Sequence, residues 1–181
     1  VKFEAGDTTQ SATVSIVNDS LNELNETVSL ILDSQNPADV VIANSPATLV
    51  ILDNDPEPSV KFKSDKYTVD ESAGKVTLEV ELSAVSGRQV TVVYETGGGT
   101  ATPGVDYEPA MGTWIFEKGQ TVQSFVVNLI DDFIPDTPET FNVGLSDPDG
   151  AKLGVPTAAE VTITDDDTIG VLLPVIIKKA N

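Results

Sequence analysis

Cysteine and histidine are absent from this sequence of 181 residues. Without cysteine there is neither a disulfide framework nor a thiolate metal site. Without histidine, the sequence lacks the commonest general base of enzymes and the commonest ligand of transition metals. The ligands left for a metal ion are carboxylate and carbonyl oxygens, which suit hard cations such as calcium.

Basic residues are also scarce, with 10 Lys and Arg against 29 Asp and Glu and a formal net charge of −19. Nucleic-acid binding needs a positively charged surface, so we expect no nucleic-acid partner. A disordered acidic tail could carry the same charge. Here, however, 40% of the residues are hydrophobic, and they stand in ordered alternating runs. We therefore expect the acidic residues on a folded body.

Long apolar stretches are missing as well. No run reaches the roughly 18 apolar residues that a membrane-spanning helix needs, so no membrane span is predicted. There is no signal peptide, and the sequence opens on Val1-Lys2-Phe3, which resembles the interior of a strand. We therefore expect a fragment of a longer chain, with any targeting segment upstream.

The sequence does contain short runs in which apolar and polar residues alternate, such as residues 76–82, 141–145 and 161–163. A period of two is typical of half-buried antiparallel strands, and no long stretch has helical spacing. Turn-forming residues separate the runs, among them Ser86-Gly87, Pro103-Gly104, Lys118-Gly119 and Asp149-Gly150. Many short strands with regular turns predict an all-β fold of the sandwich type.

An internal repeat has an offset of about 113 residues. The matching pairs are Phe3 with Phe116, Asn18-Asp19 with Asp131-Asp132, Glu26-Thr27 with Glu139-Thr140, and Asp53–Asp55 with Asp165–Asp167. We therefore predict one complete domain at residues 59–167, preceded at residues 1–56 by the C-terminal half-domain of an earlier repeat, which should supply about four strands. Pro56 and Pro58 make the link between them stiff. Residues 168–181 form an apolar C-terminal tail.

Acidic residues cluster where predicted strands end, at residues 131–139 and 165–167. Strand ends at one pole of a sandwich lie close together, so these carboxylates can converge and would repel one another unless they are neutralised. Calcium takes six to eight oxygen ligands and tolerates irregular loops. The alternative is a solvated acidic surface that aids solubility. A glycosidase is a third possibility, but Trp114 alternates with Phe116 and is expected in the core rather than in a sugar-binding cleft.

Residues 59–167 resemble a Calx-beta domain along their whole length. The resemblance rests on Tyr67–Glu71, Gly74–Leu78, Val90–Thr96, Gly99–Ala101, Gly104–Tyr107, Gly112-Thr113, Phe116, Gly119, Glu139–Phe141 and Ile163–Asp167. Residues 1–55 resemble the second half of the same domain. The resemblance implies an immunoglobulin-like, seven-stranded antiparallel β-sandwich that binds Ca²⁺.

The resemblance also implies a set of calcium ligands. In the complete domain these are Glu71, Asp106, Asp132, the Ile134 carbonyl, Asp136, Glu139, Asp165, Asp166 and Asp167. In the first copy they are Asp19, the Leu21 carbonyl, Glu23, Glu26, Asp53 and Asp55. Asn54 replaces the central Asp of the first copy, and the counterparts of Glu71 and Asp106 belong to the half of the repeat that residues 1–55 lack.

The expected function is that of a calcium-binding structural or adhesive module in an extracellular or cell-surface repeat protein, not an enzyme. Its expected partners are neighbouring repeats or copies of the same protein, and a cell-surface or carbohydrate target is open. A regulatory calcium sensor, as in sodium–calcium exchangers, is the alternative. We further expect the apolar tail at residues 171–177 to pair with an exposed sheet edge of a neighbouring chain, giving head-to-tail assembly.

Overall fold

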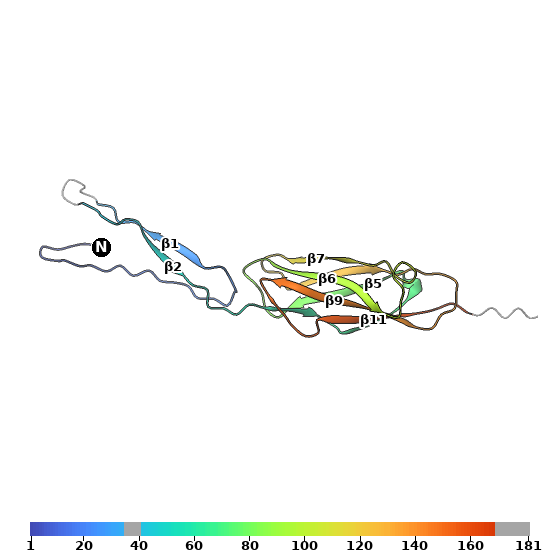
Figure 1. Ribbon diagram of the computed structural model, residues 1–181. Coiled ribbons are helices and arrows are strands. Elements are labelled where there is room, and N and C mark those ends of the chain that lie inside the picture. Colours follow the sequence, from blue (N-terminus) through green and yellow to red (C-terminus); the bar gives the residue numbers. More distant parts are fainter. Residues whose placement is uncertain (35–40, 169–181) are drawn as a thin grey trace, which may run out of the picture.

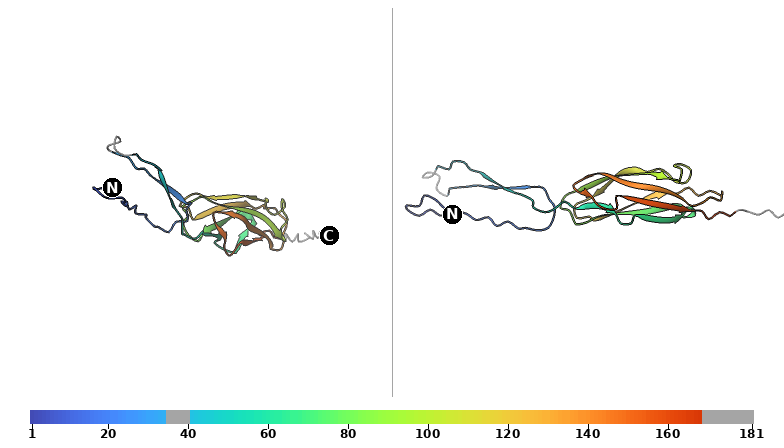
Figure 2. Two further views of the ribbon diagram at one scale, coloured as in Figure 1. Left: turned by 60° about the vertical axis from the view of Figure 1, so that its left-hand side comes forward. Right: turned by 60° about the horizontal axis from the view of Figure 1, so that its bottom comes forward.

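The computed structural model describes residues 1–34 and 41–168, and Figure 1 shows them in two parts. Residues 59–168 form a layered sandwich of strands, and residues 1–55 extend from one end of it. The two views in Figure 2 show the same end-to-end placement. The apolar tail, and with it the expected pairing of residues 171–177, lies outside the described residues.

The sandwich consists of two sheets and almost no helix. One sheet has the order β10-β3-β5-β8, with β3 at Ser59–Phe62, β5 at Lys75–Leu82, β8 at Val122–Asn128 and β10 at Lys152–Leu153. The other has the order β4-β11-β9-β6-β7, with β4 at Lys66–Asp70, β6 at Val90–Gly99, β7 at Met111–Phe116, β9 at Glu139–Asp149 and β11 at Ala158–Thr164. A 3₁₀ turn, η1 at Glu71–Ala73, follows β4. The predicted all-β sandwich is confirmed.

Two strand pairs depart from antiparallel pairing. β4 runs parallel to β11, and β10 runs parallel to β3, whereas every other pair in the sandwich is antiparallel. β3 and β4 are successive segments of the chain that lie in different sheets, and so are β10 and β11. The first and last strands therefore each cross between the sheets. When each is counted once, the sandwich has the seven strands that were predicted.

Inward-facing residues of both sheets form one hydrophobic core. Alternation along β5 buries Val76, Leu78, Val80 and Leu82, because successive side chains of a strand point to opposite faces. Trp114 is 6% exposed and lies in the core, as predicted. All members of this core lie between Val60 and Ile163, so the sandwich needs no residue from the N-terminal segment to fill its interior.

The N-terminal segment, residues 1–55, forms only a two-stranded antiparallel ribbon in its described part, with β1 at Glu26–Leu30 and β2 at Ala47–Ile51. The prediction of about four strands is therefore wrong. By the repeat offset, residues 1–3 and 9–15 correspond to parts of β7 and β8, which pair with β6 and β5 in the sandwich. Residues 1–55 contain no counterparts of β5 and β6, so these stretches have no strand with which to exchange backbone hydrogen bonds.

The N-terminal segment contacts one end of the sandwich, which we call the near pole. The Gly87 amide donates to the Asn22 carbonyl at 3.0 Å, and Asn22 forms an isolated β-bridge with Ser86. Lys118 lies 3.4 Å from the Glu23 carboxylate. The near pole thus comprises the β5–β6 and β7–β8 turns. The opposite end, the far pole, holds η1 and the segments that follow β6, β8 and β11.

Candidate metal centre

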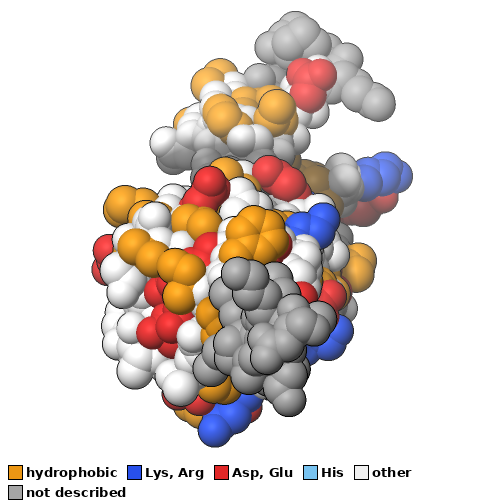
Figure 3. Space-filling model, turned by 90° about the vertical axis from the view of Figure 1, so that its right-hand side faces the viewer, with side chains coloured by type: hydrophobic (Ala, Val, Ile, Leu, Met, Phe, Trp, Pro, Cys, Tyr) orange, Lys and Arg blue, Asp and Glu red, His pale blue; other side chains and the backbone are white. Residues whose placement is uncertain are grey.

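The far pole gathers carboxylates from four separate segments of the chain. Glu71 lies in η1, Asp106 lies in the β6–β7 loop, residues 131–138 link β8 to β9, and residues 165–167 follow β11. Figure 3 looks onto this pole, where acidic side chains lie beside hydrophobic ones. Residues far apart in sequence meet here because all four segments adjoin strand ends at this pole.

Glu71 is held by the caps of η1. The Asp70 carboxylate accepts a hydrogen bond from the Ser72 amide at 3.2 Å, which satisfies a free donor at the start of the turn. Gly74 ends the turn with φ of 67°, a left-handed conformation that favours glycine. Between these caps, Oε1 of Glu71 is buried without a hydrogen-bond partner.

Asp165 ties two of the acidic segments together. Its carboxylate accepts from the Asp136 amide at 2.6 Å and from the Asp167 amide at 2.8 Å. These backbone donors, with Asp167 the stronger, hold the pKa of Asp165 below its ordinary value, because they stabilise the charged form. The neighbouring Asp167 differs: burial raises its pKa, and its Oδ2 is buried without a partner.

Two groups of carboxylates share Glu71. One oxygen from each of Glu71, Asp165 and Asp167 lies within 4.8 Å of the others, and the same holds for Glu71, Asp131 and Asp166. Burial, followed by the nearby Asp165 carboxylate, raises the pKa of Glu71 to about 7. Burial and the crowding of like charges therefore favour protonation of Glu71 when no cation is present.

Asp106 and Glu139 form a second carboxyl pair at the same pole. The Asp106 carboxylate accepts from the Thr102 amide at 2.6 Å. A hydrogen bond with Asp106, together with burial, raises the pKa of Glu139. A cavity of about 20 Å³ lies against Glu71, Asp106, Asp136, Thr137, Glu139, Ile163 and Asp165. That volume accommodates one water-sized body.

These features fit a calcium ion. The far pole offers oxygen ligands only and has two buried carboxylate oxygens without hydrogen-bond partners. Burial raises the pKa values of Glu71 and Asp167, and a hydrogen bond with Asp106 raises that of Glu139, with neighbouring carboxylates adding to each shift. Buried polar atoms normally have partners, so the unpartnered oxygens point to a missing positive group. Hard oxygen ligands on irregular loops are the surroundings in which calcium is bound.

Most of the predicted ligands of the complete domain meet at this pole. Asp165, Asp166 and Asp167 join Glu71 in the close groups, and Asp106, Asp136 and Glu139 line the cavity. Asp132 accepts from the Ile134 amide at 2.6 Å and is near enough to raise the pKa of Glu71. Metal ligation by these residues, and through the Ile134 carbonyl, stays a prediction.

Asp131 is a candidate that the sequence analysis did not include in its ligand set. Its carboxylate groups with Glu71 and Asp166. The sequence contained one signal for it, because Asp131 directly precedes Asp132 in an acidic pair. Neighbouring residues of an extended strand point in opposite directions, which favours only one of the two, but the loop after β8 is irregular and allows both to approach.

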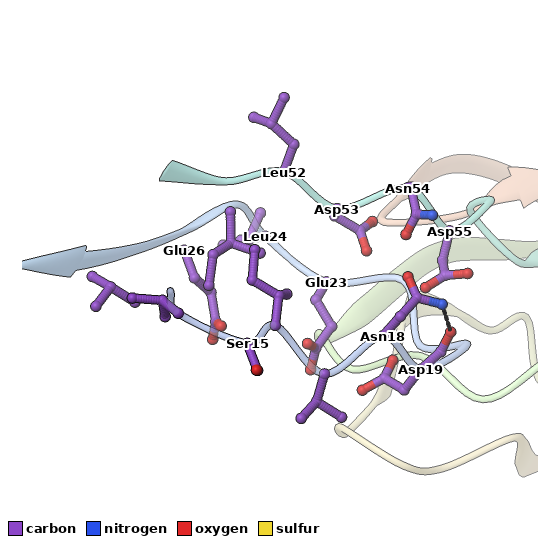
Figure 4. Close-up of a pocket in the computed structure, with 15 residues that line it drawn as sticks. Ser15, Asn18, Asp19, Glu23, Leu24, Glu26, Leu52, Asp53, Asn54 and Asp55 are labelled. Carbon is purple, nitrogen blue, oxygen red and sulfur yellow. Dashed lines mark hydrogen bonds between the residues drawn. The ribbon is translucent and has the colours of Figure 1, made fainter. Parts of the chain in front are cut away.

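The acidic residues of the N-terminal segment line a wider cleft of about 290 Å³. The predicted ligands Asp19, Glu23, Glu26, Asp53 and Asp55, together with Asn54, all border it, and Figure 4 shows them around a common space. Within the described residues, however, groups of three carboxylates with oxygens within 4.8 Å occur only at the far pole of the sandwich. The N-terminal carboxylates therefore border one cleft, but no three of them have oxygens within 4.8 Å of one another.

Comparison with known proteins gives the same family for both parts. A family model described as "Calx-beta domain" matches residues 1–55 and 53–167. The sodium/calcium exchanger Calx of Drosophila melanogaster is 36% identical over 111 residues, which cover 61% of this chain and 12% of the exchanger. FRAS1-related extracellular matrix protein 2 of Homo sapiens is 31% identical over 179 residues, which cover 92% of this chain and 6% of that protein. The chain therefore spans only a small part of these relatives.

Solved structures agree with the sequence comparison. The crystal structure of the apo form of the Calx CBD1 domain superposes with a TM-score of 0.60 at 34% identity, covering 62% of this chain and all of that domain. The calcium-binding domain CBD12 of CALX1.1 superposes with a TM-score of 0.58 at 36% identity, covering 60% of this chain and 44% of that one. This protein therefore shares both its sequence and its fold with these Calx domains. The chain belongs to the Calx-beta domain family.

Proposed function

We propose that this chain is a calcium-binding module of an extracellular or cell-surface repeat protein, in which the ion stiffens the far pole. The observation that carries the proposal is the convergence of Glu71, Asp165 and Asp167, two of which have buried oxygens without partners. The residues that would hold calcium are Glu71, Asp106, Asp131, Asp132, Asp136, Glu139, Asp165, Asp166 and Asp167. When bound, calcium neutralises the mutual repulsion of these carboxylates.

The same proposal extends to the N-terminal segment as the second half of a preceding repeat. Its acidic residues Asp19, Glu23, Asp53 and Asp55 border one cleft, and counterparts of Glu71 and Asp106 would complete their ligand set. Because Glu23 also lies 3.4 Å from Lys118 of the sandwich, a site here would adjoin the joint. Calcium in a completed first repeat should then reduce bending between the repeats.

An extracellular structural role is favoured over a regulatory one by the tandem repeats, by the stiff Pro56–Pro58 link and by the similarity to an extracellular matrix protein across nearly the whole chain. No helix in the described part of the chain is long and apolar enough to cross a membrane. The similarity to sodium/calcium exchangers supports a regulatory sensor as the second candidate. Extracellular modules bind calcium with Kd on the order of 10⁻⁴–10⁻³ M, whereas sensors need about micromolar affinity.

Calorimetric titration and thermal unfolding of the chain test the proposal. At free calcium 100-fold above Kd, binding to the native state should stabilise the sandwich by about 2.7 kcal/mol. Asp166→Ala should weaken this stabilisation, whereas Asn54→Ala, its counterpart in the first copy, should leave the unfolding of the sandwich unchanged. Identical unfolding in chelator and in millimolar calcium would refute calcium binding, and a Kd near micromolar would favour the sensor.

A further inference from the structure

Each sheet of the sandwich ends in two edge strands, which have a partner strand on one side only. The edges are β4 and β7 in one sheet and β8 and β10 in the other. Short strands and charged residues keep such edges from pairing with other chains. β10 is two residues long, and β4 carries Lys66 and Asp70 at its ends. β7 is longer and contains no charged residue and no proline, and Figure 1 shows it along the margin of the sandwich.

The pairing of β6 with β7 determines which backbone groups of β7 face outward. The Thr96 amide donates to the Ala110 carbonyl at 2.9 Å, and hydrogen-bonded positions alternate along an antiparallel pair. The backbone groups of the even-numbered residues of β7 therefore point to β6. Those of Met111, Thr113 and Ile115 point away from the sheet.

The side chains at these outward positions are exposed as well. Met111 is 73% exposed and Ile115 is 45% exposed, and Thr113 is also exposed. One outward group already has a partner, because the Gln123 side chain donates to the Ile115 carbonyl at 2.7 Å. No other described residue bonds to the outward groups. The free edge of β7 therefore presents unpaired backbone groups and apolar side chains at the same positions.

These positions are self-complementary under a twofold axis. When β7 pairs antiparallel with its copy about Thr113, Thr113 lies opposite its own counterpart and Met111 lies opposite Ile115 of the copy. Residues directly opposite one another at hydrogen-bonded positions exchange two backbone hydrogen bonds. The pairing of Met111 with Ile115 also covers exposed apolar side chains. A twofold contact of this kind is the commonest symmetry of homo-oligomers.

Charged residues outside β7 fit the same register. Position 108 lies as far before Thr113 as position 118 lies after it, so Glu108 of one copy comes opposite Lys118 of the other. Glu108 is exposed, and the Lys118 side chain is 68% exposed even beside Glu23. The twofold axis produces this attraction twice.

β8 is the other uncharged edge and gives a matched comparison. By the same alternation, counted from the hydrogen bond that the Leu82 amide donates to the Thr121 carbonyl, the backbone groups of Ser124 face outward. Twofold pairing about Ser124 would bring Glu117 opposite Asp131 of the copy. Like charges opposite one another are destabilising, so the charges favour β7 over β8.

We propose that β7 pairs with β7 of a second copy of this chain, antiparallel and about Thr113, so that two five-stranded sheets continue as one. The contact lies along the side of the sandwich and leaves both poles free, so it does not depend on calcium binding. A net charge of −19 opposes association, and salt screens this repulsion. A single contact is therefore weak, and several such repeats in one chain would strengthen it through multivalency.

Sedimentation of the full chain up to roughly millimolar concentration, in low and high salt, measures the association, and amide hydrogen exchange locates it. Dimers should form more readily in high salt, and the Met111, Thr113 and Ile115 amides should exchange more slowly in them. Thr113→Pro should abolish the dimer while Trp114 fluorescence still reports cooperative unfolding, because proline is tolerated where an edge N–H faces solvent. Ser124→Pro, which removes the matched N–H of β8, should leave the dimer intact.

Exchange of charges provides a second test that leaves β7 unchanged. Lys118→Glu and Glu108→Lys should each weaken the dimer several-fold, because each places like charges opposite one another. The double variant should restore the dimer, since the attraction returns with its direction reversed. A chain that stays monomeric in every condition, slowed exchange in β8 instead of β7, a dimer of Thr113→Pro, or a double variant no stronger than the single ones would overturn the proposal.

Discussion

The two acidic regions of this chain carry nearly the same residues, but only one of them groups its carboxylate oxygens closely. At the far pole of the sandwich, carboxylate oxygens group within 4.8 Å around Glu71. In the N-terminal segment, Asp19, Asp53 and Asp55 border a cleft of about 290 Å³ without such a group. The difference lies in what surrounds them: β4, η1 and the β6–β7 loop supply Glu71 and Asp106 to one region, and residues 1–55 have no counterpart of these elements. The aspartates that follow the last strand therefore do not form a close group of carboxylates without the residues that these elements supply.

The largest expected effect comes from the core. Phe141 is fully buried, and its ring centroid lies 4.2 Å from the ring centroid of Tyr107. Phe141→Ala should therefore destabilise the sandwich by about 3–5 kcal/mol. Val28, its counterpart in the N-terminal segment, is only half-buried, and Val28→Ala should leave the sandwich unchanged. Urea unfolding followed by Trp114 fluorescence measures the sandwich alone, because the chain has one Trp. Equal effects of the two substitutions would mean that the parts share a core.

The next effect separates the two acidic regions directly. Asp165→Ala removes the acceptor of two backbone hydrogen bonds and one of the grouped carboxylates. Calcium affinity measured by calorimetry should fall by roughly tenfold or more. The counterpart Asp53→Ala should leave the strongest calcium site unchanged. A larger loss of affinity in Asp53→Ala than in Asp165→Ala would reverse the assignment of the two regions.

This comparison also shows what could be predicted from the sequence. The alternation along β5 and the acidic residues after β11 indicated the sandwich and the pole that holds the candidate site. The ribbon of residues 1–55 was predicted with too many strands, because a local pattern does not reveal whether its hydrogen-bonding partner is present. Asp131 was missed because the ligand set was taken from the resemblance, and the sequence does not show how the irregular loop after β8 directs its two adjacent carboxylates. The crossing of the first strand between sheets depends on long-range pairing with β11, which local periodicity does not encode.

A smaller effect concerns the protonation of Glu71. The pKa of Glu71 is raised from 4.5 to about 7, so the native chain keeps a proton that the unfolded chain releases. Without calcium, the free energy of unfolding should therefore fall as the pH rises from about 4.5 to about 7. Calcium competes with this proton, so calcium affinity should decrease as the pH falls from 8 to 6. Calorimetry at both pH values should show a weaker pH dependence for Glu71→Gln than for the wild type. An unchanged dependence would mean that Glu71 keeps its ordinary pKa.

The smallest expected effect again compares matched positions. Gly119 and Gly6 both adopt positive φ, of 87° and 96°, and open space surrounds the position that a Cβ would occupy at each. Gly119→Ala should destabilise the sandwich by about 1 kcal/mol, because a left-handed conformation is strained for alanine. Gly6→Ala should not move the Trp114 transition, since residues 1–15 do not pair with a sheet. A shift with Gly6→Ala would show that the N-terminal segment supports the sandwich.

The parallel pairing of β4 with β11 determines how this domain would respond to mechanical tension. The chain enters the sandwich at the near pole, and β11 ends at the far pole, so a pulling force runs along the strands. The register from Lys66 opposite Glu160 to Asp70 opposite Thr164 is then loaded in shear. Hydrogen bonds perpendicular to a force that slides two strands past each other resist it together, whereas a hairpin pulled open from its end loses them one at a time. A string of such domains joined by stiff links would therefore resist extension until this strand pair ruptures.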